Sequence, residues 1–195
     1  MKNNFENIFF KETKFAIESI DQSKLSKIIK LLINLRKNKG RLFILGIGGS
    51  AGNASHAVND FRKLCNIDTY TPIDNISEIT AKTNDEGFDT IFDTYLKLSN
   101  LNKKDIVMIF SVGGGDIKKK ISVNLVNAIK YCKKVNSKTV SFVGKKGYAY
   151  KNSDISLIFK TNDPYFTTPI SESMQVLIWH LIVSHPLLQM NKTKW

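Results

Sequence analysis

The most constraining feature of this sequence is a regular alternation of short apolar runs with longer stretches of helical periodicity. Arg41-Leu-Phe-Ile-Leu-Gly46 is the clearest run, since it is almost wholly apolar and ends at a glycine. Such runs are typical of strands buried on both faces of a parallel sheet. Comparable runs lie at residues 41–46, 68–72, 105–110, 139–143 and 154–159. Helical stretches separate or follow them, at residues 50–64, 85–98, 118–134 and 171–183. This alternation predicts βαβ units, and hence an α/β fold with a parallel sheet between two layers of helices.

The N-terminal region has a different pattern, in which apolar residues of segment 5–38 favour helices. Asp21 or Ser23 is available as a helix cap, and Gly40 is placed to end the second helix. No internal repeat, low-complexity tract or linker interrupts the 195 residues. We therefore expect one domain, 1–195, with N-terminal helices over 1–38 and an α/β core over 39–190.

Composition limits the cellular setting and the partners. Cys65 and Cys132 are far apart and form no CxxC pair, which disfavours a disulfide framework and favours a reducing compartment. The N-terminus lacks a signal-peptide pattern, and no apolar stretch reaches membrane-spanning length. We therefore expect a cytoplasmic protein with no membrane partner. The net charge of +12 fits either an anionic partner or a Lys- and Asn-rich composition. Without a helix-turn-helix, zinc finger or aromatic-basic strip, we expect no nucleic acid as partner.

Two glycine-rich segments follow predicted strands, at the end of the sheet where ligands of parallel sheets bind. Gly46-Ile-Gly-Gly-Ser50 opens a helix, and Ser111-Val-Gly-Gly-Gly-Asp116 follows the run at 105–110. Glycines let the backbone approach a ligand closely, and a helix N-terminus favours an anionic group. The first segment is neither GxGxxG nor a P-loop, and a tight strand-to-helix turn explains it equally well.

His56 and Asp60 are four residues apart on a predicted helix, so that their side chains project from one face. A histidine and a carboxylate at this spacing suit a divalent metal or an acid–base pair. The alternative is a surface pair joined by a hydrogen bond. For His180, the alternative to a functional role is a core histidine beside Trp179.

Several motifs together resemble the sugar-isomerase (SIS) family of the phosphoheptose isomerase type. Gly46-Ile-Gly-Gly-Ser-Ala51, followed by His56 and Asp60, is similar to the family's G-N-G-G-S-A…H-x-x-x-E pattern. Thr83-Asn-Asp-Glu-Gly-Phe88 resembles its N-D-x-G-F segment, and Glu172 and His180 lie where it has a Gln and a His. The order and spacing match along roughly residues 40–185. The resemblance implies a flavodoxin-like, doubly wound SIS domain with a five-stranded parallel sheet, assembled as a homotetramer with sites at subunit interfaces.

The resemblance also implies an activity, which is the isomerisation of sedoheptulose 7-phosphate to a heptose 7-phosphate through an enediol(ate), in the synthesis of surface-polysaccharide sugars. The phosphorylated sugar is the expected small-molecule partner. A divalent metal, taken as zinc, is the expected cofactor. The metal ligands carried over by position are His56, Asp60, Glu172 and His180, and the catalytic residues are Asp60, His180 and Glu172. The substrate-binding residues are Gly48, Gly49, Ser50, Asn84, Asp85, Ser111, Gly113 and Asp116.

Glu172 and His180 are eight residues apart, about 12 Å along a straight helix. Zinc ligands lie about 2 Å from the metal, so one helix can hardly supply both to one ion. Because the family builds its site where subunits meet, we expect Glu172 and His180 of different chains to combine.

Two single positions and one loop depart from the family pattern. Asp60 replaces a glutamate, and Glu172 replaces a glutamine. The phosphate loop of the family reads S-T-S-G-x-S, whereas the segment Ser111–Asp116 keeps only its first hydroxyl and ends in a carboxylate. A carboxylate facing a phosphate is repulsive unless a cation intervenes, and one of Lys118, Lys119 and Lys120 could supply that cation. The loop therefore leaves open a different phosphosugar, a sugar with its phosphate elsewhere or a nucleotide-linked sugar as substrate. It also leaves open a non-catalytic SIS domain that binds a phosphosugar and regulates a partner.

Overall fold

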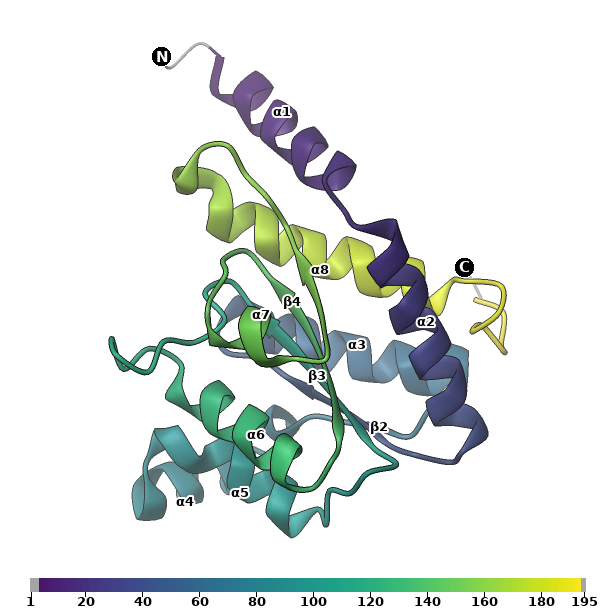
Figure 1. The fold of residues 1–195 in the computed structure, drawn as a ribbon, viewed down its shortest axis with the longest axis vertical. Helices are drawn as coiled ribbons and strands as arrows, with labels where there is room; N and C mark the ends of the chain where they lie inside the picture. Colours follow the sequence, from purple (N-terminus) through teal and green to yellow (C-terminus); the bar gives the residue numbers. More distant parts are fainter. Residues whose placement is uncertain (1–3, 194–195) are drawn as a thin grey trace.

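The computed structural model describes residues 4–193 and is built around a five-stranded parallel sheet with strand order β2-β1-β3-β4-β5 (Figure 1). The strands are β1 (Leu42–Leu45), β2 (Thr69–Tyr70), β3 (Ile106–Ser111), β4 (Lys138–Val143) and β5 (Ile155–Ile158). The helices are α1 (Phe5–Glu18), α2 (Gln22–Lys37), α3 (Gly49–Cys65), α4 (Ile76–Glu86), α5 (Ile91–Leu98), α6 (Val123–Lys134), α7 (Tyr148–Asn152) and α8 (Thr167–Val183). The expected α/β fold and its five strands are confirmed.

Alternate residues of the central strands enter two separate cores, because successive side chains of a strand point to opposite faces of a sheet. Ile44 and Met108 pack into the core formed with α2, α3 and α8. Phe43 and Val107 pack on the other face, against α5, α6 and α7. Figure 1 shows this layered arrangement, with α8 lying beside α3 and α1 lying alongside α8 on the side away from the sheet. Because both sheet faces are covered, the central strand β1 is apolar and buried at every residue.

The order of the strands places the two glycine-rich segments next to each other. The chain passes from β1 outward to β2 and then returns to pair β3 on the other side of β1. The position where this direction reverses is where doubly wound sheets bind ligands, beyond the carboxyl ends of the strands. Segment 46–50 follows β1 and segment 111–116 follows β3. The fold thus places the N-terminus of α3 at the position where doubly wound sheets bind ligands.

The segment after Ser111 differs from the sequence prediction. A helix was expected from residue 118, but α6 begins only at Val123. Residues 116–121 instead form a hairpin in which Asp116 and Ile121 exchange two backbone hydrogen bonds of 2.8 and 3.0 Å. Lys120 and Ser122 have positive φ values of 53° and 48°, which a continuous α-helix does not allow. The prediction of a helix over 118–122 was wrong.

The helix α4 was not predicted, although the sequence holds a local signal for it. Asn75 precedes the helix, and its side-chain oxygen accepts a hydrogen bond of 3.2 Å from the amide of Glu78. This is the cap that asparagine favours at a helix N-terminus. No helix among residues 4–193 has the length and apolar character needed to cross a bilayer.

Candidate functional site

The candidate site lies where α3 and α8 run side by side in the same direction. Gly49 contacts Glu172 near the beginnings of the two helices, and Asp60 faces His180 toward their ends. We call the facing residues the α3–α8 seam: Gly49, Asn53, His56 and Asp60 of α3, and Glu172, Gln175, Trp179 and His180 of α8. Residues three or four apart share a helix face, so each helix lines the seam with one stripe of side chains.

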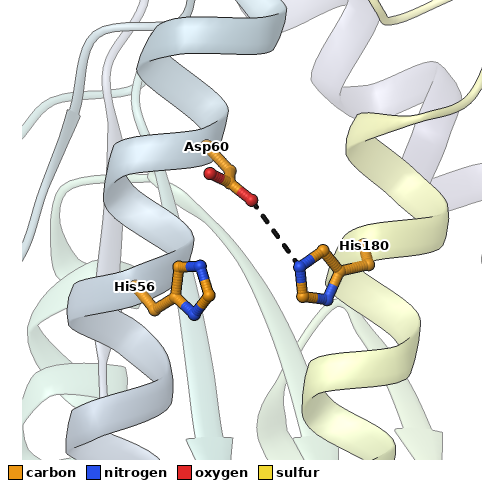
Figure 2. A group of neighbouring side chains, drawn as sticks. All are labelled: His56, Asp60 and His180. Atoms are coloured by element: carbon orange, nitrogen blue, oxygen red, sulfur yellow. Dashed lines mark ion pairs between the residues drawn. The ribbon is translucent and has the colours of Figure 1, made fainter. Parts of the chain in front are cut away.

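Three of the four predicted metal ligands meet in the seam. His56, Asp60 and His180 each offer one ligand atom, and these atoms lie within 4.8 Å of one another. Figure 2 shows His56 and Asp60 projecting from α3 toward His180 on α8. Asp60 is buried, whereas the side chain of His180 is 46% exposed. The interpretation of His180 as a core histidine is therefore wrong, and this group can be reached from solvent.

Hydrogen bonds orient the ligand atoms of this group. Nδ1 of His180 lies 2.9 Å from the carbonyl oxygen of Val176, which can only accept a hydrogen bond, so Nδ1 is placed as the donor and Nε2 is left to face the seam. Nε2 is 3.7 Å from Oδ2 of Asp60. The other oxygen of Asp60, Oδ1, accepts a bond of 2.9 Å from the side-chain amide of Asn59. A histidine fixed by a backbone carbonyl, and a carboxylate with one oxygen engaged, are typical surroundings of metal ligands.

Glu172 lies at the other end of the seam and is not part of the three-residue group. Its carboxylate fills the space beside Gly49, at the N-terminus of α3, where an anionic group is favoured. A Cβ atom at Gly49 would lie 2.6 Å from both carboxylate oxygens. The glycine at position 49 therefore makes room for a side chain of this same chain, in addition to any ligand.

A buried polar network ties this end of the seam together. The side-chain amide of Asn53 donates to the carbonyl of Glu172 at 3.0 Å and to Oε1 of Gln175 at 2.9 Å. Nε2 of Gln175 donates in turn to Oγ of Ser50 at 3.0 Å. Gln175 and Ser50 are buried. The predicted substrate residue Ser50 thus uses its hydroxyl within the fold, and the network fixes α3 against α8.

Of the remaining predicted substrate-binding residues, Gly48 lies at the start of α3, and Asn84 and Asp85 lie near the end of α4. Gly48 caps α3 with φ +62° and ψ −129°, a conformation that is open to glycine and closed to other residues. Asn84 and Asp85 are exposed near the end of α4, where the amide of Asn84 donates to the carboxylate of Asp85 at 2.8 Å. The structure holds these two residues at the surface of the molecule.

The loop after β3 uses its own polar groups internally. Oγ of Ser111 accepts a bond of 2.9 Å from the amide of Gly114, and a carboxylate oxygen of Asp116 accepts one of 3.1 Å from the amide of Lys119. Gly113 is exposed. The side chains of Lys118, Lys119 and Lys120 are exposed on the hairpin, and no ion pair joins any of them to Asp116 among the described residues.

Sequence reasoning missed Asn53, Gln175 and Trp179. Asn53 and Gln175 could have been found from the helical repeat, because Asn53 precedes His56 by three residues and Gln175 follows Glu172 by three. Trp179 adjoins His180 in the sequence, but its contact with His56 on the other helix depends on how α3 and α8 pack.

The chain matches the family model described as SIS domain over residues 9–144. The chain belongs to the SIS domain family. It is 28% identical over 186 residues to a phosphoheptose isomerase of Aliarcobacter butzleri, with 91% of each chain covered. It is 30% identical over 178 residues to one of Helicobacter pylori, covering 87% of this chain and 85% of the relative. Its fold is similar to that of phosphoheptose isomerase from Neisseria gonorrhoeae, with TM-score 0.78, 20% identity and coverage of 94% and 98%. The resemblance inferred from the motifs is confirmed.

Proposed function

We propose that this SIS domain is an aldose–ketose isomerase of sugar phosphates, with sedoheptulose 7-phosphate as substrate. The observation that carries the proposal is the convergence of His56, Asp60 and His180 in the α3–α8 seam. These residue types suit proton transfer and metal binding, and the relatives named phosphoheptose isomerase match most of the chain. The reaction would supply a heptose phosphate for the assembly of surface polysaccharides in the cytoplasm.

The donor set fits a divalent metal such as zinc. Zinc accepts neutral imidazole nitrogen and carboxylate oxygen, and catalytic sites use three such protein ligands with one position open. His56, Asp60 and His180 would hold it, since Nε2 of His180 is free of its backbone bond and Oδ2 of Asp60 faces it. When bound, the metal would polarise the carbonyl and hydroxyl oxygens of the sugar.

The exposure of Asp60 and Glu172 indicates which role each has in the reaction. Asp60 is buried and faces His180. This position suits a residue that orients His180 and neutralises positive charge, rather than one that contacts the sugar. Glu172 carries the additional carboxylate of this sequence, and we assign to it the transfer of the proton. Its carboxylate takes the proton from C1 of the ketose, and the O1 proton moves to O2 through the enediol. The proton then returns to C2, which completes the aldose without any net loss of atoms.

Such a reaction requires Glu172 near His180, and we propose that the site lies between two subunits. Within one chain the two residues are about 12 Å apart along α8. Leu177 and Leu181, which flank His180 on α8, are exposed, as are Phe10 and Ile17 of α1. These exposed apolar residues on α8 and α1 support a homo-oligomer, which we propose to be a tetramer, in which Glu172 of a neighbouring subunit completes the site.

The test is the conversion of sedoheptulose 7-phosphate by the wild type, by Glu172→Ala, by His180→Ala and by a refolded mixture of the two variants. We expect the wild type to form the aldose and each variant alone to be inactive. In the mixture, random assortment should restore roughly a quarter of the sites if each site joins two chains. An active wild type with no recovery in the mixture would contradict the shared site.

The altered loop after β3 favours one alternative, a non-catalytic SIS domain that binds a phosphosugar and regulates a partner. Ser111 and Asp116 bond to amides of their own loop, so this loop offers a phosphate fewer free hydroxyls than the family pattern. A folded wild type that binds phosphosugar but forms no aldose would support this alternative and would contradict the isomerase.

A further inference from the structure

We propose that Trp179 is a positioning residue whose indole ring fixes the imidazoles of His56 and His180 for metal binding. This inference rests on the metal site of the proposed function, but not on the identity of the sugar. Trp179 is fully buried and belongs to the core between the sheet and α8. It does not offer a ligand atom, so its effect on a metal would pass through the two histidines.

The indole contacts both rings. The centroid of the Trp179 ring lies 3.5 Å from that of His180, with the planes inclined by 31°. The ring of His56 meets it edge-on at 4.7 Å and 67°. The two imidazoles are themselves 5.6 Å apart and nearly perpendicular, at 85°. One rigid side chain therefore limits the rotation of two ligands that come from different helices.

The indole nitrogen supports the same interpretation. Nε1 of Trp179 is buried and has no hydrogen-bond partner among the described residues. A buried N–H group normally finds a partner, and leaving it without one costs free energy. Violations of this kind are expected at functional sites, where the shape of a side chain matters more than its contribution to stability. We infer that Trp179 serves as a rigid wall behind the histidines.

The first experiment measures Co²⁺ binding to metal-free protein by visible absorption, without any sugar. The variants are Trp179→Leu, Trp179→Phe and, as a matched control, Phe142→Leu. Phe142 is a fully buried aromatic residue of β4 that stacks on Phe110. Thermal unfolding of each variant reports the loss of packing separately from the loss of metal binding.

We expect Trp179→Leu to raise the Kd for Co²⁺ by about 10- to 100-fold, the range seen when residues that orient metal ligands are replaced. Trp179→Phe keeps an aromatic ring beside His180 and should recover much of this loss. Phe142→Leu should leave the Kd within about twofold, because a core cavity away from the ligands alters stability rather than their orientation. Equal Kd values for the wild type and Trp179→Leu would overturn the proposal, as would an equal loss in Phe142→Leu.

A second measurement needs no change at Trp179 and remains valid if Trp179→Leu fails to fold. The chain has two tryptophans, so Trp195→Phe leaves Trp179 as the sole tryptophan, whose emission is excited selectively at wavelengths that tyrosine does not absorb. Saturating Co²⁺ should quench most of its fluorescence, because the indole touches both imidazoles. Unchanged emission, or a wild type that binds no Co²⁺, contradicts the proposal. A wild type that binds Co²⁺ with these properties but does not isomerise the sugar rejects the proposed function and leaves this inference standing.

Discussion

The glycines at the start of α3 allow the role of Glu172 to be tested by one substitution at matched positions. An alanine Cβ at Gly49 would lie 2.6 Å from both carboxylate oxygens of Glu172, whereas ordinary contacts begin at 3.4 Å. The carboxylate must therefore move by about 0.8 Å, the difference between these distances. It lies at the far end of a flexible side chain, so the movement costs little stability. Alanine also gains up to about 1 kcal/mol over glycine within a helix.

We expect Gly49→Ala to unfold at nearly the same urea concentration as the wild type but to lose activity. A misplacement of about 1 Å can reduce a catalysed rate on the order of 100-fold, and we expect kcat to fall by about that factor. The assays are urea denaturation followed by circular dichroism, and initial rates of conversion of sedoheptulose 7-phosphate.

Two neighbouring glycines serve as controls. At Gly52 a Cβ would meet nothing within 4 Å, so Gly52→Ala should keep full activity and gain up to about 1 kcal/mol of stability. At Gly46 a Cβ would lie 2.3 Å from the backbone oxygen of Ser50, which cannot move as a side chain can. Gly46→Ala should therefore lose about 3 kcal/mol or more. Full activity in a stable Gly49→Ala variant would refute the assignment of proton transfer to Glu172.

Two further predictions concern the cysteines and Asp154. Burial raises the pKa of both Cys65 and Cys132 to about 12, so a thiol reagent at pH 8 should label neither in the folded protein and both in urea; labelling of the native protein would contradict this. Burial acts to raise the pKa of Asp154, but hydrogen bonds from Lys138 and Thr139 outweigh it and lower the pKa. This carboxylate therefore stabilises the fold above its unfolded pKa of about 3.9, and the contribution is lost as the pH falls through its folded pKa. The stability difference between the wild type and Asp154→Asn should accordingly shrink from pH 7 to low pH, and a constant difference would refute it.

The strands were predictable because burial on both faces requires short, largely apolar runs in the sequence. The run predicted at 105–110 corresponds to β3, Ile106–Ser111, and every residue of this strand is buried. The hairpin after Asp116 was not predictable in the same way. Lys118, Lys119 and Lys120 fit a solvated helix as well as a turn, and backbone bonds between Asp116 and Ile121 decide between the two.

The candidate site was predictable in part, for a related reason. The spacing of His56 and Asp60 follows from the geometry of one helix, whereas their approach to His180 depends on the packing of α3 against α8. The family motif supplied that third residue in advance. Neither the motif nor the spacing indicated that Trp179 contacts both histidines, since its contact with His56 arises only when both helices are in place.

The most direct test of the central claim follows the transferred proton by NMR, with sedoheptulose 7-phosphate in D₂O and either wild-type protein or His180→Ala. We expect the wild type to place deuterium at C1 of the ketose and C2 of the aldose, and His180→Ala to do neither. This result would establish proton transfer through an enediol at the α3–α8 seam. A folded, metal-loaded wild type that exchanges no proton would contradict the account.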